Sequence, residues 1–208
     1  MKTDSIYGVY NEVLPQVMRT LTDKVIQFNW ERVQSTGHPI YEHFNYRVKS
    51  EDSMREKCTR RGLPQTPESA LLELKDSIGL RIITNFVDDI YKTAAFIRDL
   101  PNVTVITEKD YIKNVKPNGY RSYHMILQLE APYEDIMGNN PGKWYAEVQL
   151  RTIAMDSWAS LEHKMKYKKE IRNQELIEAE LKRCADELAA CDVSMETIRN
   201  LIRESTVS

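Results

Sequence analysis

The segment WYAEVQLR, residues 144–151, decides the fold prediction because apolar and polar side chains alternate along its length. One set of alternate positions is apolar throughout: Trp144, Ala146, Val148 and Leu150. Successive side chains of a β-strand point to opposite faces of a sheet, so this alternation is typical of a strand with one buried face. We therefore predict a strand whose other face carries Glu147 toward solvent or into a cleft.

The segments around this strand predict a sheet covered by helices. Short runs rich in β-branched residues predict three more strands, at IGLRIITNF (78–86), VTVIT (103–107) and YHMILQLE (123–130). Apolar residues at helical spacing predict helices over residues 7–34, 50–61, 67–76, 87–100, 153–167 and 171–203. Because helices and strands are interspersed in this order, we expect one compact α/β domain with a mixed sheet.

The composition is that of an ordinary globular protein. Of 208 residues, 41% are apolar and 29% are charged. No run approaches the ~20 apolar residues of a membrane span, and the first residues lack the apolar core of a secretion signal. We therefore expect a cytoplasmic protein with no membrane partner. The three cysteines lack metal-site spacing, so we expect reduced thiols and no zinc.

The net charge of −2 gives no general attraction to nucleic acid, so we expect no stable nucleic acid partner. Any polyanion must meet a local basic patch, and the loop KDYIKNVKPNGYRSYH, residues 109–124, is one. Asn118 and Gly119 predict a turn that presents backbone N–H groups, and the cations around it are Lys109, Lys113, Lys116 and Arg121. A solvated hairpin is the plainer interpretation of these lysines. Tyr120 favours a nucleotide, because its ring offers a flat face to a base.

Two carboxylates suggest a metal site. Asp76 precedes the predicted strand at 78–86, and Glu147 lies on the polar face of the strand at 144–151. An aspartate and a glutamate from neighbouring strands are suited to hold Mg²⁺ against phosphates. A lone strand glutamate is more often solvated, so spacing alone leaves both interpretations open.

Several motifs together resemble the synthetase domain of the RelA/SpoT family. They stand in family order: RVKSEDSMREK (47–57), DSIGLRI (76–82), DYIKNVKPNGYRSYH (110–124), AEVQLRT (146–152) and WASLEHK (158–164). The resemblance runs over about residues 41–168, and with this length the chain is similar to a single-domain small alarmone synthetase. It implies a nucleotidyltransferase-like fold with a mixed five-stranded sheet. Four strands are predicted above, so the position of the fifth strand is left open.

The resemblance implies an enzyme, a GTP/GDP pyrophosphokinase of the stringent response. Such enzymes transfer the β,γ-pyrophosphate of ATP to the ribose 3′-hydroxyl of GDP or GTP, and the products are ppGpp or pppGpp and AMP. By resemblance, Arg47 and Arg81 hold the adenine of ATP between their guanidinium planes. The residues implied to contact the ATP phosphates are Lys49, Ser53, Lys57 and Arg60.

The resemblance also implies a catalytic pair and an acceptor site. Asp76 and Glu147 are expected to bind Mg²⁺, and Glu147 is also expected to accept the proton of the attacking hydroxyl. Tyr120 is expected to stack on guanine. The other residues expected at the GDP/GTP site are Lys109, Lys116, Asn118, Arg121 and His124.

Two other functions fit the sequence less well. Toxic relatives pyrophosphorylate the 3′ end of tRNA, but the C-terminal segment 170–204 is mixed to acidic and offers no basic surface for tRNA. A catalytically silent nucleotide-sensing module would be expected to lack Asp76 or Glu147, and both are present. None of the four histidines precedes an aspartate, so the His-Asp pair of the family's hydrolase domain is missing and we expect no hydrolase activity.

The terminal helices are expected to mediate assembly. We divide the chain into an N-terminal helical extension (1–40), a catalytic core (41–168) and a C-terminal oligomerisation segment (169–208). In the C-terminal segment apolar residues recur at alternating steps of four and three: Ile177, Leu181, Cys184, Leu188, Cys191, Met195, Ile198 and Ile202. This is the spacing of a coiled-coil seam, and with the family resemblance it predicts a homotetramer. The plainer interpretation is that the whole stripe packs on the N-terminal helix of its own chain.

Overall fold

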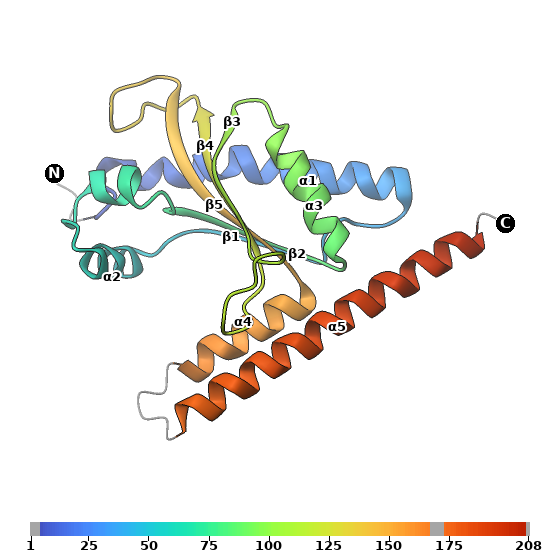
Figure 1. Ribbon diagram of the computed structural model, residues 1–208. Coiled ribbons are helices and arrows are strands. Elements are labelled where there is room, and N and C mark those ends of the chain that lie inside the picture. The colour runs from blue at the N-terminus through green and yellow to red at the C-terminus, as the bar shows by residue number, and fades with distance from the viewer. Residues whose placement is uncertain (1–4, 167–172, 207–208) are drawn as a thin grey trace.

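The computed structural model describes residues 5–166 and 173–206, which form a sheet with helices on both faces (Figure 1). The strands are β1 (His43–Val48), β2 (Ile78–Thr84), β3 (Val103–Asp110), β4 (Tyr123–Ala131) and β5 (Gly142–Thr152). The helices are α1 (Leu14–Thr36), α2 (Glu51–Arg61), α3 (Val87–Arg98), α4 (Ile153–Lys166) and α5 (Gln174–Thr206), with short turns η1 (Gly8–Glu12) and η2 (Ser69–Glu73).

The strand order within the described residues is β1-β2-β5-β4-β3. β2 pairs with β5 in parallel, and the other neighbouring strands are antiparallel. The predicted α/β fold with a mixed five-stranded sheet is therefore confirmed. In β5 the four apolar positions of the predicted buried face are all buried, while Glu147 and Gln149 on the other face are partly exposed.

One face of the sheet is fully covered by α1 and α3 (Figure 1). The buried side chains of α1 fall at helical spacing: Leu14, Val17, Leu21 and Val25. Those of α3 do so as well: Ile90, Ala94 and Ile97. The two helices meet where the Phe28 and Phe96 rings stack with centroids 3.9 Å apart. Burial of these apolar side chains is the main stabilising contribution to the fold.

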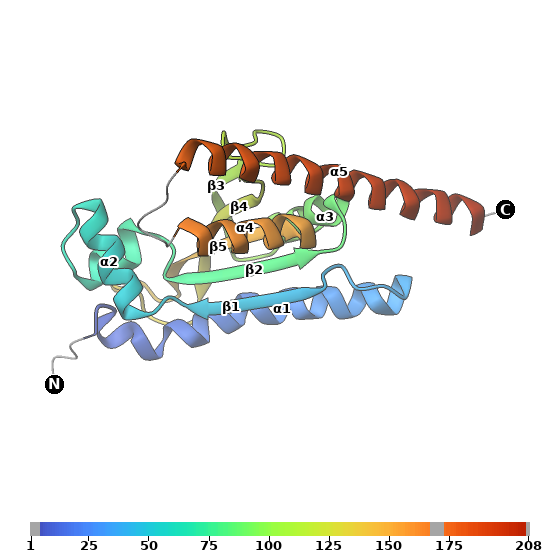
Figure 2. The ribbon, with the colours of Figure 1, turned by 90° about the horizontal axis from the view of Figure 1, so that it is seen from below.

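The other face is covered only in part. α4 leaves the end of β5 directly and packs on β2 and β5, and α5 runs alongside α4 (Figure 2). Trp158, Ala159 and Ala185 form a small buried cluster between these two helices. The Trp158 indole nitrogen donates a hydrogen bond to the Leu181 carbonyl at 2.8 Å. The rest of this face, beside α2, carries polar side chains.

The strand left unplaced by the sequence is β1, an edge strand paired with β2. Its side chains are exposed or only half-buried, so it lacks the apolar run by which the other strands were found. Apolar residues do alternate with polar ones along it, at Phe44, Tyr46 and Val48, and this alternation was the signal that could have predicted the strand. The helix predicted over 67–76 is only a short π-helical turn, η2, and it gives way to Lys75 with a φ of 56°.

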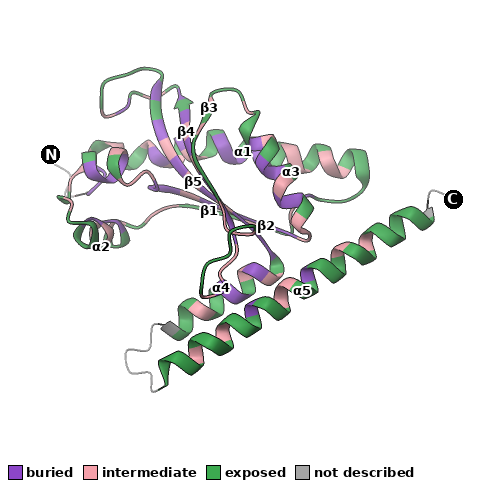
Figure 3. Cartoon of the chain, in the orientation of Figure 1, coloured by how far each residue is buried: buried purple, intermediate pink, exposed green. Residues whose placement is uncertain are grey.

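The apolar stripe of α5 is divided in the structure. Ile177, Leu181 and Leu188 are half-buried, and the last two pack on the Trp158 cluster of their own chain. The remaining members of the stripe are exposed in the single chain: Cys184, Cys191, Met195, Ile198 and Ile202. The plainer interpretation is therefore wrong about the partner and the extent of the contact, because the first half of α5 packs on α4 of the same chain and not on the N-terminal helix. The second half extends beyond the sheet, and most of its residues are exposed (Figure 3).

The predicted helix limits agree with the structure within a few residues, except that Tyr167 and Ile171 lie outside the described residues, as does the predicted boundary at 168/169. None of the helices in residues 5–166 and 173–206 combines the length and apolar character needed to cross a bilayer.

Candidate active site

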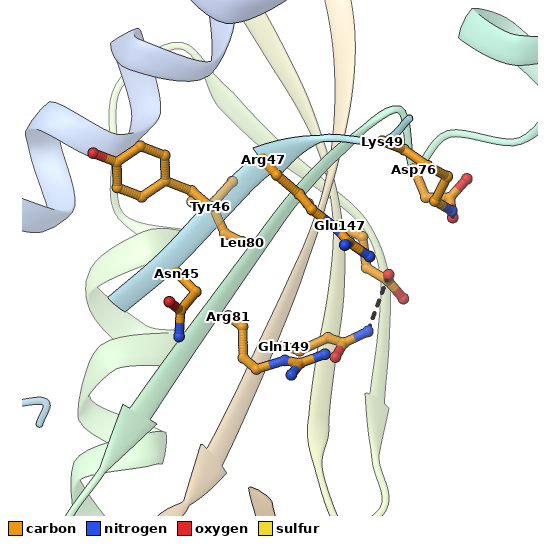
Figure 4. A pocket seen from close by; sticks show the side chains of 10 residues that line it. Asn45, Tyr46, Arg47, Lys49, Asp76, Leu80, Arg81, Glu147 and Gln149 are labelled. Atoms are coloured by element: carbon orange, nitrogen blue, oxygen red, sulfur yellow. Dashed lines mark hydrogen bonds and ion pairs between the residues drawn. The ribbon is translucent and has the colours of Figure 1, made fainter. Parts of the chain in front are cut away.

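A pocket of about 350 Å³ opens on the partly covered face of the sheet, over β1, β2 and β5 (Figure 4). Ten residues line it: Asn45, Tyr46, Arg47, Lys49, Asp76, Gly79, Leu80, Arg81, Glu147 and Gln149. Five of them were predicted as site residues from the sequence, namely Arg47, Lys49, Asp76, Arg81 and Glu147. The fold therefore brings together groups that lie far apart along the chain.

Strand register explains why these side chains meet. Arg47 of β1 lies opposite Gly79 of β2, and Gly79 lies opposite Glu147 of β5. Residues directly opposite each other in a sheet share a face, so all three belong to one row. Because Gly79 has no side chain, the space between Arg47 and Glu147 stays open.

The next row is polar across all five described strands: Asn45, Arg81, Gln149, His124 and Lys109. It places Arg81 on the pocket side of Glu147 and His124 on the opposite side. Burial is the main cause that lowers the pKa of Arg81, and the nearby Arg151 charge adds to it. Two residues of this row were not predicted from the sequence: Asn45, which lies on the unplaced strand, and Gln149, which is two residues from Glu147 on the same face.

Asp76 lies just before β2 and is buried. Its Oδ2 atom accepts hydrogen bonds from Lys49 and from Lys57, the latter at 2.5 Å. Its Oδ1 atom is buried and has no hydrogen-bond partner among the described residues. A buried carboxylate oxygen without a partner costs about 1–3 kcal/mol, so this atom is suited to a ligand that is not part of the chain.

The donor set fits magnesium. Mg²⁺ prefers oxygen ligands and is usually bound by one or two carboxylates together with substrate phosphates. Asp76 and Glu147 supply carboxylate oxygens in the same pocket, and Asp76 Oδ1 is unpaired among the described residues. No group of three or more histidine, cysteine or acidic side chains suited to a metal occurs in the described part of the chain, so phosphate oxygens would have to complete the coordination.

Glu147 has donors on both carboxylate oxygens. The His124 Nδ1 atom lies 3.3 Å from Oε1, and Gln149 Nε2 donates to Oε2 at 3.2 Å. Burial raises the pKa of Glu147, but the His124 and Gln149 hydrogen bonds and the nearby positive charges, including Lys57, together outweigh it and lower the pKa. The carboxylate is therefore ionised at neutral pH, as both a metal ligand and a proton acceptor require.

Tyr120 differs in one respect from the sequence expectation. The sequence predicts a ring that offers a flat face to a base, but the ring is half-buried and packs against the Trp158 cluster, with the Tyr120 and Trp158 ring centroids 6.4 Å apart. The Lys116 ammonium lies 4.9 Å from the centroid of the Tyr120 ring. The Tyr120 hydroxyl lies 2.8 Å from His124 Nε2, so the loop reaches the side of Glu147 that faces away from the pocket.

Two predicted acceptor residues support the loop in this structure. Arg121 donates hydrogen bonds to the Ala185 carbonyl at 3.2 Å and to Asp186 at 3.0 Å, both on α5. The Asn118 amide donates to Glu162 on α4, and its oxygen accepts from the Tyr120 backbone N–H. These contacts turn both side chains toward the helices, and their predicted contact with the nucleotide stays a prediction.

The remaining predicted residues do not line the pocket. Ser53 and Arg60 are exposed on the first and last turns of α2, whose N-cap is Ser50. Ser53 is hydrogen-bonded to the Ser50 side chain at 2.9 Å. Lys109 is exposed on β3 directly opposite His124. Of the four residues predicted to contact the ATP phosphates, Lys49 and Lys57 reach Asp76, and phosphate contact by Ser53 and Arg60 stays a prediction.

Comparison with known proteins gives one family. The region found in RelA / SpoT proteins matches residues 46–172. The GTP pyrophosphokinase YwaC of Bacillus subtilis is 41% identical over 132 residues, which span 64% of this chain and only 61% of YwaC. The GTP pyrophosphokinase YjbM of the same organism is 32% identical over 168 residues, 81% of this chain and 76% of YjbM.

Solved structures agree with this match. The small alarmone synthetase 1 from Bacillus subtilis superimposes with a TM-score of 0.75 at 29% identity, covering 94% of this chain and 98% of that one. The same protein bound to its product pppGpp gives a TM-score of 0.75 at 29% identity, covering 91% and 94%. Bound to AMPCPP it gives 0.71 at 28% identity, covering 92% and 94%.

The close approach of the loop to α5 is testable at Gly119. Gly119 has a φ of +88°, and a Cβ atom there would lie 2.6 Å from the Ala185 Cβ. We expect Gly119→Ala to lower the free energy of unfolding by about 1–3 kcal/mol, through backbone strain and overpacking. Gly138→Ala is the matched control, because Gly138 has a φ of +79° but open space around it. Denaturant titrations that gave equal losses for both variants would contradict the contact.

Proposed function

Because this chain belongs to the family defined by the region found in RelA / SpoT proteins, we propose that it is a (p)ppGpp synthetase. It transfers the β,γ-pyrophosphate of ATP to the ribose 3′-hydroxyl of GDP or GTP and releases AMP. The observation that carries the proposal is the meeting of Asp76, Lys49 and Glu147 in one pocket that two arginines also line. Its relatives named GTP pyrophosphokinase, and the solved relative bound to pppGpp and to AMPCPP, support it.

The ATP site lies over β1 and β2. Arg47 and Arg81 stand on neighbouring strands one row apart, which is roughly 7 Å along the strand direction. That spacing accommodates a purine ring between two guanidinium planes, and guanidinium groups stack well on aromatic faces. Lys49 lines the pocket beside Asp76, which Lys57 also contacts, and both lysines meet the phosphates.

The reacting groups meet between Asp76 and Glu147. These two carboxylates would hold Mg²⁺, which when bound neutralises charge that develops on the triphosphate. Lys49 and Lys57 supply fixed positive charge beside Asp76. Glu147 is ionised and accepts the proton of the 3′-hydroxyl as that oxygen attacks the β-phosphorus.

The acceptor nucleotide occupies the side of Glu147 that faces β4. Tyr120 stacks on guanine, while His124, Lys116 and Lys109 meet the phosphates of GDP or GTP. The Tyr120 ring is held by the Trp158 cluster before the nucleotide arrives, which reduces the conformational cost of stacking.

The choice of acceptor tests this proposal directly. The purified protein is incubated with ATP labelled at the β- and γ-phosphates, Mg²⁺, and GDP, GTP or deacylated tRNA. We expect labelled ppGpp or pppGpp with AMP formed in equal amount. Label on the tRNA alone would support the tRNA-modifying alternative, and no transfer to any acceptor would support a silent sensing module.

Removal of either carboxylate should abolish synthesis. We expect Asp76→Ala and Glu147→Ala each to lower kcat by roughly three orders of magnitude or more, because several kcal/mol of transition-state stabilisation are lost. The control is Glu130→Ala, an exposed glutamate on β4 outside the pocket. Circular dichroism confirms folding, and a folded Glu147→Ala protein with near-normal turnover would refute the role of Glu147.

Assembly into a homotetramer through the terminal helices is part of the proposal. The exposed apolar residues of the second half of α5 are suited to a helix from another copy: Met195, Ile198, Leu201 and Ile202. The first half of α5 already packs on α4 and is not needed for this contact.

Substitution on α5 separates assembly from folding. Ile198→Asp should dissociate the oligomer and leave the separate chains folded, because Ile198 is exposed in the single chain. Leu188→Asp should instead lower the melting temperature, because Leu188 packs on the Trp158 cluster. Asn200→Asp adds a charge at an exposed position of the same helix and is the control. Light scattering that shows a wild-type monomer at micromolar concentration would contradict the assembly.

A further inference from the structure

Arg151 occupies a position behind the candidate active site that none of the predicted roles covers. It is the last polar residue on the Glu147 face of β5, and it is only 6% exposed. Its guanidinium donates hydrogen bonds to four side chains: Ser122 at 3.3 Å, Asp156 at 2.9 Å, Tyr120 at 2.8 Å and Gln149 at 3.2 Å. Because it is buried behind Tyr120 and Gln149, it cannot reach a nucleotide in the pocket.

We propose that Arg151 is a positioning residue that fixes both hydrogen bonds to the Glu147 carboxylate. This inference rests on the proposed synthetase function, and it adds a residue that acts only through others. Two chains of hydrogen bonds lead from Arg151 to Glu147, one through Tyr120 and His124 and the other through Gln149. Together they close a ring of five side chains.

The first chain has one consistent direction. A guanidinium group only donates hydrogen bonds, so the Tyr120 oxygen accepts from Arg151 and its own proton is free to point to His124 Nε2, 2.8 Å away. An ionised carboxylate only accepts, so His124 donates from Nδ1 to Glu147 Oε1. In neutral His124 these two bonds select a single tautomer, with the proton on Nδ1.

The second chain fixes an amide. Gln149 Oε1 accepts from Arg151, so its NH₂ group is turned toward Glu147 Oε2, to which it donates at 3.2 Å. Without the arginine, the amide could rotate and present its oxygen to the carboxylate, which is repulsive. Both oxygens of Glu147 therefore receive donors whose orientation depends on Arg151.

Arg151 is itself held from the far side. Asp156, on the first turn of α4, accepts from Arg151 at 2.9 Å and lies 3.6 Å from Arg81 Nη1. Ser122, which donates to the Leu150 carbonyl, accepts from Arg151 Nε. These partners set the guanidinium plane in the absence of substrate, and a group held in this way can preorganise its neighbours.

Conservative variants isolate this role. Arg151→Lys keeps the charge beside Asp156, but one ammonium group cannot reproduce the planar fork that reaches Tyr120 and Gln149 together. Tyr120→Phe keeps the ring and removes only the hydroxyl. We expect each to lower kcat for synthesis by roughly tenfold, as the loss of a hydrogen bond of about 1.4 kcal/mol predicts, while KM for ATP changes by less than about twofold. The sequence-based expectation covers only the stacking of the Tyr120 ring on guanine, and this role of the hydroxyl is additional to it.

The double variant provides the decisive readout. If Arg151 acts in part through the Tyr120 hydroxyl, the loss in kcat for Arg151→Lys with Tyr120→Phe should be clearly smaller than the product of the two single losses. Tyr123→Phe, whose ring lies on the opposite face of β4, and Arg183→Lys, exposed on α5, are controls expected to keep wild-type kcat. Melting temperatures establish that all variants are folded.

The outcomes distinguish this inference from the function on which it rests. A wild-type protein that makes no pyrophosphorylated guanosine nucleotide overturns the proposed function and this inference with it. An active wild type overturns the inference alone if folded Arg151→Lys keeps wild-type kcat, if the two single losses multiply in the double variant, or if KM for ATP rises while kcat is retained.

Discussion

The parallel pairing of β2 with β5 is the constraint on which the site depends. It sets Gly79 beside Glu147 and Arg81 beside Gln149, although the two strands are far apart in the sequence. Asp76, just before β2, is thereby carried to the same pocket as Glu147. A shift of the register by one residue would turn Glu147 to the covered face of the sheet, because side chains alternate along a strand. Burial of Trp144, Ala146, Val148 and Leu150 prevents that shift.

A second set of contacts supports the acceptor side. The loop with Gly119 and Tyr120 is held between β4 and the two C-terminal helices, and Arg121 joins it to α5. Asp192 of α5 also accepts a hydrogen bond from Thr152, at 2.7 Å, where β5 passes into α4. The helix whose second half is proposed to mediate assembly therefore contacts, with its first half, the loop proposed to bind the acceptor.

Much of this arrangement was predictable from the sequence, and the remainder has physical reasons. The alternation in β5 and the helical spacing in α1 and α3 report burial, so those elements were correctly predicted. β1 buries little and carries no such signal, although it supplies Arg47 to the pocket. The motifs identified Asp76, Glu147 and Tyr120, but the roles of Arg121 and Arg151 depend on which neighbours they meet in three dimensions. Sequence patterns record burial and periodicity, and they do not record the direction of a hydrogen bond.

The central claim is that Glu147 lies between a donor site on β1 and β2 and an acceptor site on β4. A structure of the protein with a non-hydrolysable ATP analogue and GDP tests this most directly. We expect adenine between Arg47 and Arg81, guanine on Tyr120, and the acceptor 3′-hydroxyl within hydrogen-bond distance of Glu147. An acceptor nucleotide bound elsewhere, with its 3′-hydroxyl directed away from Glu147, would contradict it.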